Sequence, residues 1–227
     1  MLYRDLIPGR LGGRYIASHI TIPEGGPVDD WVHYHRVALQ LIVVRRGWVR
    51  VLYQDQGNSF VLTEGDMVLQ PPGIRHRVLE SSPALEVIEI SAPALHETFA
   101  DHDMALPNGV ADRLFDRQRF LRHVAMETDW TPFIAAEAQE TGMSQATAGL
   151  AEVRTIRPRN TTDLSVPAHD GELVFGFVLD GSASLDETQI GPDDAFVIPP
   201  GKNWSLRGMS GDFRLLHVTT ARLDAAA

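Results

Sequence analysis

Three histidines and one glutamine in the first third of the chain have the types and spacing of metal ligands. His33 and His35 are separated by one residue, Gln40 follows five residues later, and His76 comes shortly after the Pro-Pro-Gly sequence at 71–73. Alternate side chains of a β-strand point the same way, so His33 and His35 can reach a common point. Gln40 and His76 can join them from neighbouring strands. Three imidazoles and one amide oxygen suit a divalent transition metal.

Glycines and prolines around these residues complete two motifs. The first consists of Gly25-Gly26, His33, His35, Gln40 and Gly47, and the second of Gly65, Pro71, Gly73 and His76. Together they resemble the two motifs of the cupin superfamily. Two positions depart from the usual pattern, because Gln40 stands where a glutamate is common and Glu80 where an asparagine often follows the last histidine. The resemblance implies a small β-barrel with the metal inside it.

The second half of the chain repeats the first. Twelve residues separate His35 from Gly47, and twelve separate His169 from Gly181. The other matching pairs are Pro71-Pro72-Gly73 with Pro199-Pro200-Gly201, and residues 85–91 with residues 213–219. Internal self-similarity of this kind indicates a duplicated structural unit. We therefore predict a bicupin.

Short apolar runs punctuated by Gly, Pro, Asn and Asp are typical of antiparallel all-β barrels. The predicted fold is all-β, with two cupin (double-stranded β-helix, or jelly-roll) barrels in tandem and a short, partly helical linker. The predicted boundaries are 1–105 for the metal-binding cupin, 106–144 for the linker and 145–227 for a degenerate cupin. Within the linker, the spacing of apolar residues over Ala111–Val124 approximates a helix.

The second repeat has lost most of the ligand set. In the alignment, Pro167 replaces His33, Val174 replaces Gln40 and Trp204 replaces His76, whereas His169 matches His35. One imidazole cannot hold a catalytic metal, so we expect a metal-free barrel packed with apolar side chains that serves as a scaffold or dimer surface. The alternative is a separate ligand pocket with Trp204 as its stacking wall.

The chain contains no cysteine, so the site must use nitrogen and oxygen ligands. We expect one divalent transition metal per chain, with Fe(II) as the first choice and Zn, Mn, Ni or Cu as alternatives. Because Gln40 is neutral, the metal keeps its full charge, which favours an anionic or enolisable small-molecule substrate.

The resemblance leaves three classes of function open. Three-histidine sites occur in cupin dioxygenases, so oxygen-dependent carbon–carbon cleavage of a carbonyl-containing or hydroxyaromatic molecule is the first choice. A three-histidine-plus-glutamine set also resembles non-redox cupins, which favours a metal-assisted isomerase, cyclase or ring-opening enzyme. The third alternative is a non-catalytic cupin that binds a small molecule.

A second catalytic group must come from the barrel interior. Glu80 is the first candidate because it lies four residues after His76, on the same face if the strand is regular. Tyr53 and Arg50 lie on opposite faces of an earlier strand, and either can bind a substrate. Glu86 and Glu89 also lie on opposite faces, so one of them is expected to point inward. Candidate lid residues are Trp31, His96, His102 and Asp103.

The composition and net charge of the chain limit the classes of partner that it is expected to bind. The chain has 227 residues, 44% of them hydrophobic, and a formal net charge of −10, which argues against nucleic acid and anionic membranes as partners. The chain holds no apolar run of membrane-spanning length and starts without a basic segment followed by an apolar one, so we expect a cytoplasmic protein. A homodimer is expected because open sheet edges need cover.

Overall fold

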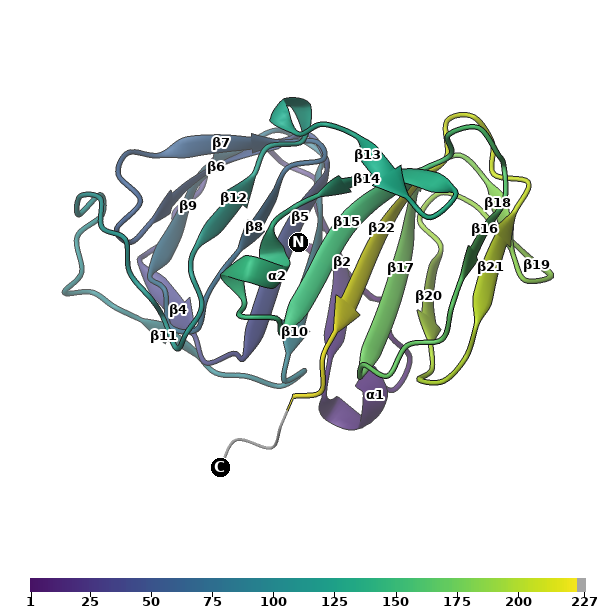
Figure 1. Cartoon of the computed structure of the whole chain (residues 1–227). Coiled ribbons are helices and arrows are strands. Elements are labelled where there is room, and N and C mark those ends of the chain that lie inside the picture. The colour runs from purple at the N-terminus through teal and green to yellow at the C-terminus, as the bar shows by residue number, and fades with distance from the viewer. Residues whose placement is uncertain (224–227) are drawn as a thin grey trace. The chain divides into compact units, whose positions relative to one another are not determined.

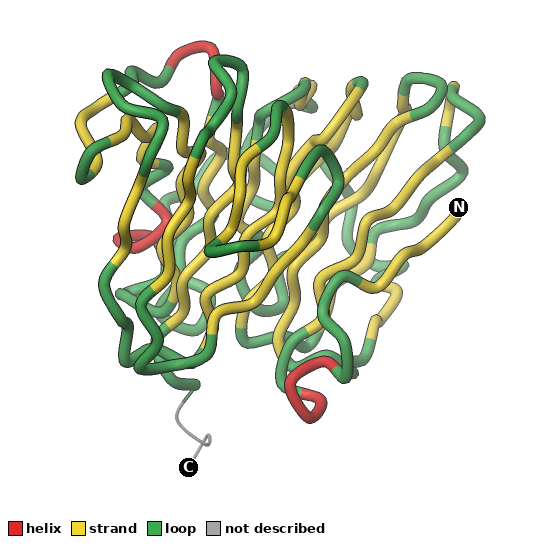
Figure 2. The backbone as a smooth tube through the Cα atoms, turned by 90° about the vertical axis from the view of Figure 1, so that its right-hand side faces the viewer, coloured by secondary structure: helices red, strands yellow, loops and turns green. Residues whose placement is uncertain are grey.

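The computed structural model describes residues 1–223, whose regular secondary structure is almost entirely β-strand (Figure 1). It divides into two compact units, Met1–Ala125 and Met126–Ala227. Helical segments are confined to the short α1 (Arg10–Gly13), α2 (Met143–Ala146) and the 3-10 turn η1 (Ala125–Glu127), which are red in Figure 2. Among the described residues, no helix has the length and apolar character needed to cross a membrane.

The N-terminal unit consists of two facing antiparallel sheets. One has the order β1-β2-β10-β5-β8-β12, and the other the order β11-β4-β9-β6-β7, with β3 also paired to β9. The strands are β1 (Leu2–Asp5), β2 (Ile16–Ile22), β3 (Gly26–Pro27), β4 (His33–His35), β5 (Leu39–Arg46), β6 (Trp48–Tyr53), β7 (Phe60–Thr63), β8 (Met67–Leu69), β9 (His76–Ser81), β10 (Leu85–Ala92), β11 (Thr98–Ala100) and β12 (Leu121–His123).

Alternation along these strands decides which side chains point inward. Val49, Val51 and Tyr53 on β6 and Leu85 and Val87 on β10 all belong to one buried cluster between the two sheets. Residues with the same parity further along each strand share that inward face. The core therefore marks the interior of a barrel, into which any functional side chain must also point.

The C-terminal unit repeats this plan. Its sheets have the orders β13-β14-β15-β22-β17-β20 and β16-β21-β18-β19. The strands are β13 (Thr131–Phe133), β14 (Ala136–Glu140), β15 (Ala151–Arg157), β16 (Leu164–Val166), β17 (Leu173–Asp180), β18 (Ala183–Leu185), β19 (Thr188–Ile190), β20 (Ala195–Ile198), β21 (Trp204–Arg207) and β22 (Arg214–Thr220). The prediction of an all-β fold with two barrels is confirmed.

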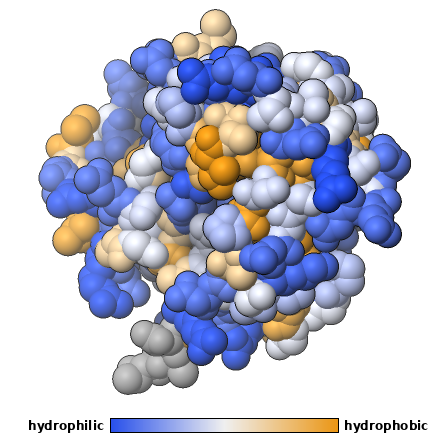
Figure 3. All heavy atoms as spheres, turned by 45° about the vertical axis from the view of Figure 1, so that its right-hand side comes forward, coloured by the Kyte–Doolittle hydropathy of each residue, from blue (hydrophilic) through white to orange (hydrophobic). Residues whose placement is uncertain are grey.

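Most of the surface in the view of Figure 3 is hydrophilic, with apolar atoms in smaller areas between polar side chains. Large apolar residues are instead collected inside the units, including Trp204, Phe213 and Leu215 of the C-terminal unit. The two barrels thus bury their apolar side chains as the strand alternation requires.

The helix expected over Ala111–Val124 does not form, so this prediction was wrong. Asp116 and Arg117 both have positive φ, at 47° and 66°, and the flanking Phe115 and Gln118 exchange two backbone hydrogen bonds. This is the geometry of a tight primed turn, which no helix can contain. Phe115 packs into the core of the N-terminal unit instead. Further along the segment 106–144, β12 pairs with β8 and β14 pairs with β15.

Two equivalent glycines show that the repeat extends to turn geometry. Gly47 and Gly181 have φ of 82° and 71°, and a Cβ atom on either would come within 2.5 Å of the hydroxyl of Ser82 or Ser210, respectively. Each of these hydroxyls also accepts a hydrogen bond from the backbone N–H of the residue after the glycine. The twelve-residue spacing seen in the sequence therefore ends, in both units, at a turn that only glycine fits.

We expect Gly181→Ala to lower the free energy of unfolding by about 1–3 kcal/mol, because the side chain is strained at positive φ and overlaps the backbone of Phe213. Urea denaturation measures the effect. Gly191→Ala is the control, since a Cβ there meets nothing within 4 Å and φ lies outside the left-handed region. Equal unfolding midpoints for the two variants would contradict the assignment.

Candidate metal centre

The structure brings His33, His35 and His76 together inside the N-terminal barrel. His33 and His35 lie on the same side of β4, and the antiparallel register places His76 of β9 directly opposite His33. One ring nitrogen from each histidine lies within 4.8 Å of those of the other two. The ring centroids of His33 and His76 are 4.3 Å apart. Three converging imidazole nitrogens form the donor set of a transition-metal site.

Each of the three rings is oriented by a hydrogen bond at its Nδ1 atom. Nδ1 of His33 lies 2.9 Å from the Trp31 carbonyl, and Nδ1 of His76 lies 3.2 Å from the Ile74 carbonyl. Nδ1 of His35 lies 2.8 Å from the Thr98 hydroxyl. A carbonyl can only accept, so Nδ1 carries the proton in His33 and His76, and Nε2 keeps its lone pair. Metal-binding histidines are typically held by such hydrogen bonds from the second ring nitrogen.

Burial keeps the rings of His35 and His76 neutral. It lowers the pKa of His35 to about 4, assisted by the neighbouring His33 and His96. Burial likewise holds the pKa of His76 well below its ordinary value, and His33 and His35 add to the effect. Only the unprotonated imidazole binds a metal, so the site is ready for a cation at neutral pH.

Gln40 points into the same barrel. It shares its face of β5 with Ile42 and Val44, which belong to the core, and is only 3% exposed. Its Nε2 donates to Oε1 of Glu89 at 2.9 Å. The amide oxygen of Gln40 is therefore the atom left to serve as a fourth ligand.

Glu89 is the inward carboxylate of β10. It continues the parity of Leu85 and Val87, and it accepts hydrogen bonds from Gln40 and from the Ser91 hydroxyl. The sequence left open which of Glu86 and Glu89 points inward. Glu86 lies on the other face, where it contacts His19 at 2.9 Å. Apolar residues occupy both faces of β10, with Leu85 and Val87 on one and Ile88 and Ile90 on the other, so the sequence of this strand could not separate the two.

Tyr53 links this carboxylate to the histidines. Its ring stacks on His76 with a centroid distance of 5.5 Å, and its side chain lies in the barrel core. Burial and then the negative charge of Glu89 raise the pKa of the Tyr53 phenol. Tyr53 therefore stays protonated at neutral pH and can donate a hydrogen bond inside the barrel.

Glu80 and Arg50 do not face the interior, which corrects the prediction for Glu80. Strand β9 is irregular, since Arg50 pairs with Glu80 whereas Val51 pairs with Val78, leaving Leu79 as an extra residue. This β-bulge reverses the parity after Val78. Glu80 and Arg50 form an ion pair of 3.4 Å on the outer face, and each side chain is 40% exposed.

Three of the candidate lid residues, His96, Trp31 and His102, lie against the site or against each other. The ring of His96 is 5.6 Å from that of His35. Trp31, which is 63% exposed, makes an edge contact of 5.9 Å with His102. Trp31 also supplies the carbonyl that orients His33. The segments before β4 and after β10 thus form the rim of the histidine cluster.

Comparison with known proteins supports the fold. Residues 18–90, which carry all four predicted ligands, match the model of the cupin domain family. The chain is similar to salicylate 1,2-dioxygenase from Pseudaminobacter salicylatoxidans, with 14% identity and a TM-score of 0.70 over 96% of this chain and 76% of the enzyme. It is also similar to two oxalate decarboxylases. The Lactobacillus farciminis enzyme is 15% identical, with a TM-score of 0.67 over 96% of this chain and 81% of the enzyme. A mutant of the Bacillus subtilis enzyme is 12% identical, with a TM-score of 0.67 over 99% of this chain and 73% of the mutant. No curated protein matches the sequence.

Residues 18–90 are therefore a cupin domain, and the chain as a whole has the fold of a bicupin. Its C-terminal cupin lacks the histidine cluster, and among the described residues of 126–223 no three histidine or carboxylate side chains converge. Trp204, the counterpart of His76, lies opposite Val166, just as His76 lies opposite His33. The residue that corresponds to His33 is therefore Val166, and not Pro167 as the sequence alignment predicts. His169 does match His35, because the glycine of each Pro-Pro-Gly sequence donates its N–H to the carbonyl of that histidine.

In this bicupin we expect His35→Ala to reduce bound metal from about one ion per chain to near zero, because two imidazoles and an amide do not hold a transition metal tightly. Elemental analysis after purification without chelator measures the content. His169→Ala is the matched control and should keep the full complement. A halved metal content in the His169 variant would show that the C-terminal cupin also binds metal.

The metal-free protein should lose stability as the pH falls from about 6.5 to about 4. In this window the histidines of the unfolded chain take up protons that the buried His35 and His76 do not accept, so the unfolded state is favoured. Urea denaturation with chelator at pH 7 and pH 5 measures the drop. The drop should be smaller in His35→Gln, and an equal drop in both proteins would contradict the lowered pKa.

Proposed function

We propose that the N-terminal cupin is the active site of a metal-dependent enzyme, with iron(II)-dependent dioxygenation of a small hydroxyaromatic or enolisable carbonyl compound as its reaction. The observation that carries this proposal is the convergence of three imidazoles beside a protonated phenol and an inward carboxylate. A purely structural metal site would be closed by a fourth strong ligand.

The ligand set suits a substrate that chelates as an anion. His33, His35 and His76 would hold the metal through Nε2, with the Gln40 oxygen beside them. Because all four groups are neutral, a bound divalent ion would keep its charge and supply a Lewis acid for the substrate oxygens and a binding site for dioxygen. Zn, Mn, Ni and Cu fit the same donors, so the choice of iron belongs to the proposal.

Glu89 is the group that we assign to proton transfer. It lies inside the barrel and is held by hydrogen bonds from Gln40 and Ser91, so its position is set before substrate binds. A carboxylate in this place can take the proton of a substrate hydroxyl or of an acidic C–H. Tyr53 can then donate to an oxygen of the resulting anion, because its phenol remains protonated.

The similarity in fold to a salicylate 1,2-dioxygenase favours the oxygen-dependent reaction. A second candidate is metal-assisted isomerisation, cyclisation or ring opening without oxygen. The Gln40–Glu89 pair favours it, since a positioned base beside a Lewis acid is sufficient for proton transfer. Both candidates use the same residues and differ in the metal and in the need for oxygen.

Elemental analysis combined with oxygen uptake separates them. We expect about one iron per chain and oxygen consumption that depends on substrate, measured after iron reconstitution with a panel of hydroxybenzoates and β-diketones. One zinc, nickel or manganese per chain with no oxygen uptake but with turnover would establish the non-redox enzyme. Binding of these compounds without turnover would overturn both and leave a binding protein.

We expect Glu89→Gln to lower kcat by about a hundredfold or more while metal content stays unchanged, because the variant removes the proton acceptor and not a ligand. Glu80→Gln is the matched control and should keep full activity, since its side chain lies outside the barrel. Steady-state kinetics beside elemental analysis test both variants. Loss of activity in the Glu80 variant alone would reverse the assignment.

A further inference from the structure

The interior of the C-terminal cupin contains a cavity of about 410 Å³ that the proposed reaction does not use. Its lining includes His217 of β22, Arg154 of β15, Phe133 of β13, and His169. His217 lies directly opposite Arg154 on one side and Gly176 of β17 on the other. In the N-terminal cupin the equivalent position is held by Glu89, which lies opposite Ser18 of β2 and Ile42 of β5.

His217 is buried without a partner. Its side chain belongs to a residue that is 3% exposed, and neither ring nitrogen makes a hydrogen bond to any part of the chain between residues 1 and 223. His169 donates from Nε2 to the Ile198 carbonyl at 3.0 Å, which leaves its Nδ1 also without a partner among those residues. Buried polar groups are normally hydrogen-bonded, so two such rings beside one cavity point to a ligand.

The charges around the cavity disfavour an anion. Arg154 is the cation in the lining, and Glu140 and Glu152 contact its guanidinium at 2.9 Å and 2.5 Å. Asp170 adds a further carboxylate to the lining. Burial, and then Arg154 and His169, lower the pKa of His217 to about 3, so the ring is neutral. A neutral imidazole offers one donor and one acceptor nitrogen.

The remaining walls are apolar and aromatic. The ring of Phe133, which lines the cavity, lies 6.4 Å from that of His217. Trp204 is not part of the lining, but its ring packs 5.6 Å from that of His217. Val166 and Pro167 also line the cavity. Such walls around a few polar groups are typical of small-molecule sites.

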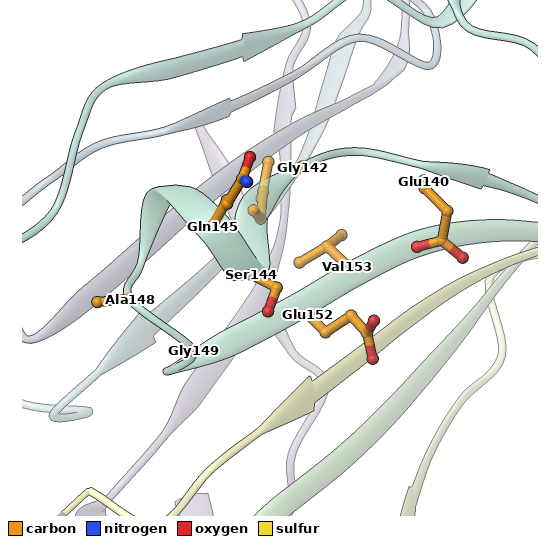
Figure 4. Close-up of a pocket in the computed structure, with 9 residues that line it drawn as sticks. Glu140, Gly142, Ser144, Gln145, Ala148, Gly149, Glu152 and Val153 are labelled. Carbon is orange, nitrogen blue, oxygen red and sulfur yellow. The ribbon is translucent and has the colours of Figure 1, made fainter.

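A second hollow, beside α2, does not show these features (Figure 4). It is lined by Glu140 and Glu152, and both carboxylates are already paired with Arg154. No buried unpaired side chain among the described residues belongs to its lining. The cavity at His217 is therefore the stronger site.

We propose that the C-terminal cupin binds a small uncharged hydroxylated aromatic molecule of the phenol class, held by hydrogen bonds to His217 between apolar and aromatic walls. The hydroxyl of such a ligand can donate to one ring nitrogen of an imidazole or accept from the other. This site is independent of the metal and of the reaction proposed for the N-terminal cupin.

Phenol itself is the probe, with benzoate as an anionic control of similar size. Titration into protein with ¹⁵N-labelled histidine, in the His35→Ala background to remove the N-terminal metal centre, reports on the His217 nitrogens by NMR. We expect phenol to shift the His217 signals with a dissociation constant in the millimolar range, and benzoate to leave them unchanged. His217→Phe should weaken phenol binding at least tenfold, measured by ligand-observed NMR.

A second variant, at the mouth of the cavity, tests the proposal even if His217→Phe does not fold. Ala168 is exposed and lines the cavity, so Ala168→Trp should fold normally and block phenol. Unmoved His217 signals, equal phenol binding in His217→Phe, or tighter binding of benzoate than of phenol would overturn the proposal. Each of these outcomes leaves the proposed reaction of the N-terminal cupin untouched, because the probe reports only on the other barrel.

Discussion

The antiparallel register of β4 and β9 is the constraint on which the metal centre depends. It sets His33 opposite His76, and the alternation of β4 brings His35 to the same side. Backbone and side-chain oxygens around these strands then hold the three rings with Nε2 directed inward. A shift of one residue in this register would turn His76 away from the barrel. The convergence of the three rings thus depends on pairing between strands whose facing residues, His33 and His76, are 43 residues apart in the chain.

The two cupins share one framework and differ in the side chains that point into it. Their central strands keep the same pairing, and the turn after each of Gly47 and Gly181 is closed by a serine. At equivalent inward positions, however, Glu89 is replaced by His217, and Gln40 by Val174. One interior thus combines a carboxylate with three converging imidazoles, whereas the other combines a neutral imidazole with a paired arginine and aromatic side chains.

The bulge at Leu79 decides which carboxylate belongs to the site. The inward face of a regular strand would have included Glu80, and the extra residue places it outside with Arg50. The carboxylate inside the barrel comes instead from β10, where Gln40 reaches it across the sheet. Bulges are common next to functional sites because they redirect single side chains without disturbing the rest of a sheet.

The convergence of three histidines, the duplication and the all-β fold could all be predicted from the sequence. These features rest on local spacing, on glycines at tight turns and on alternation within single strands, which are properties of neighbouring residues. Four features could be established only from the folded chain: Glu89 faces the barrel interior, Glu80 does not, residues 116–117 form a turn in place of a helix, and His217 is buried beside a cavity without a partner among residues 1–223. Each of these depends on pairing between distant strands or on packing inside a closed barrel, and the free energies that select them come from contacts that no short stretch of sequence contains.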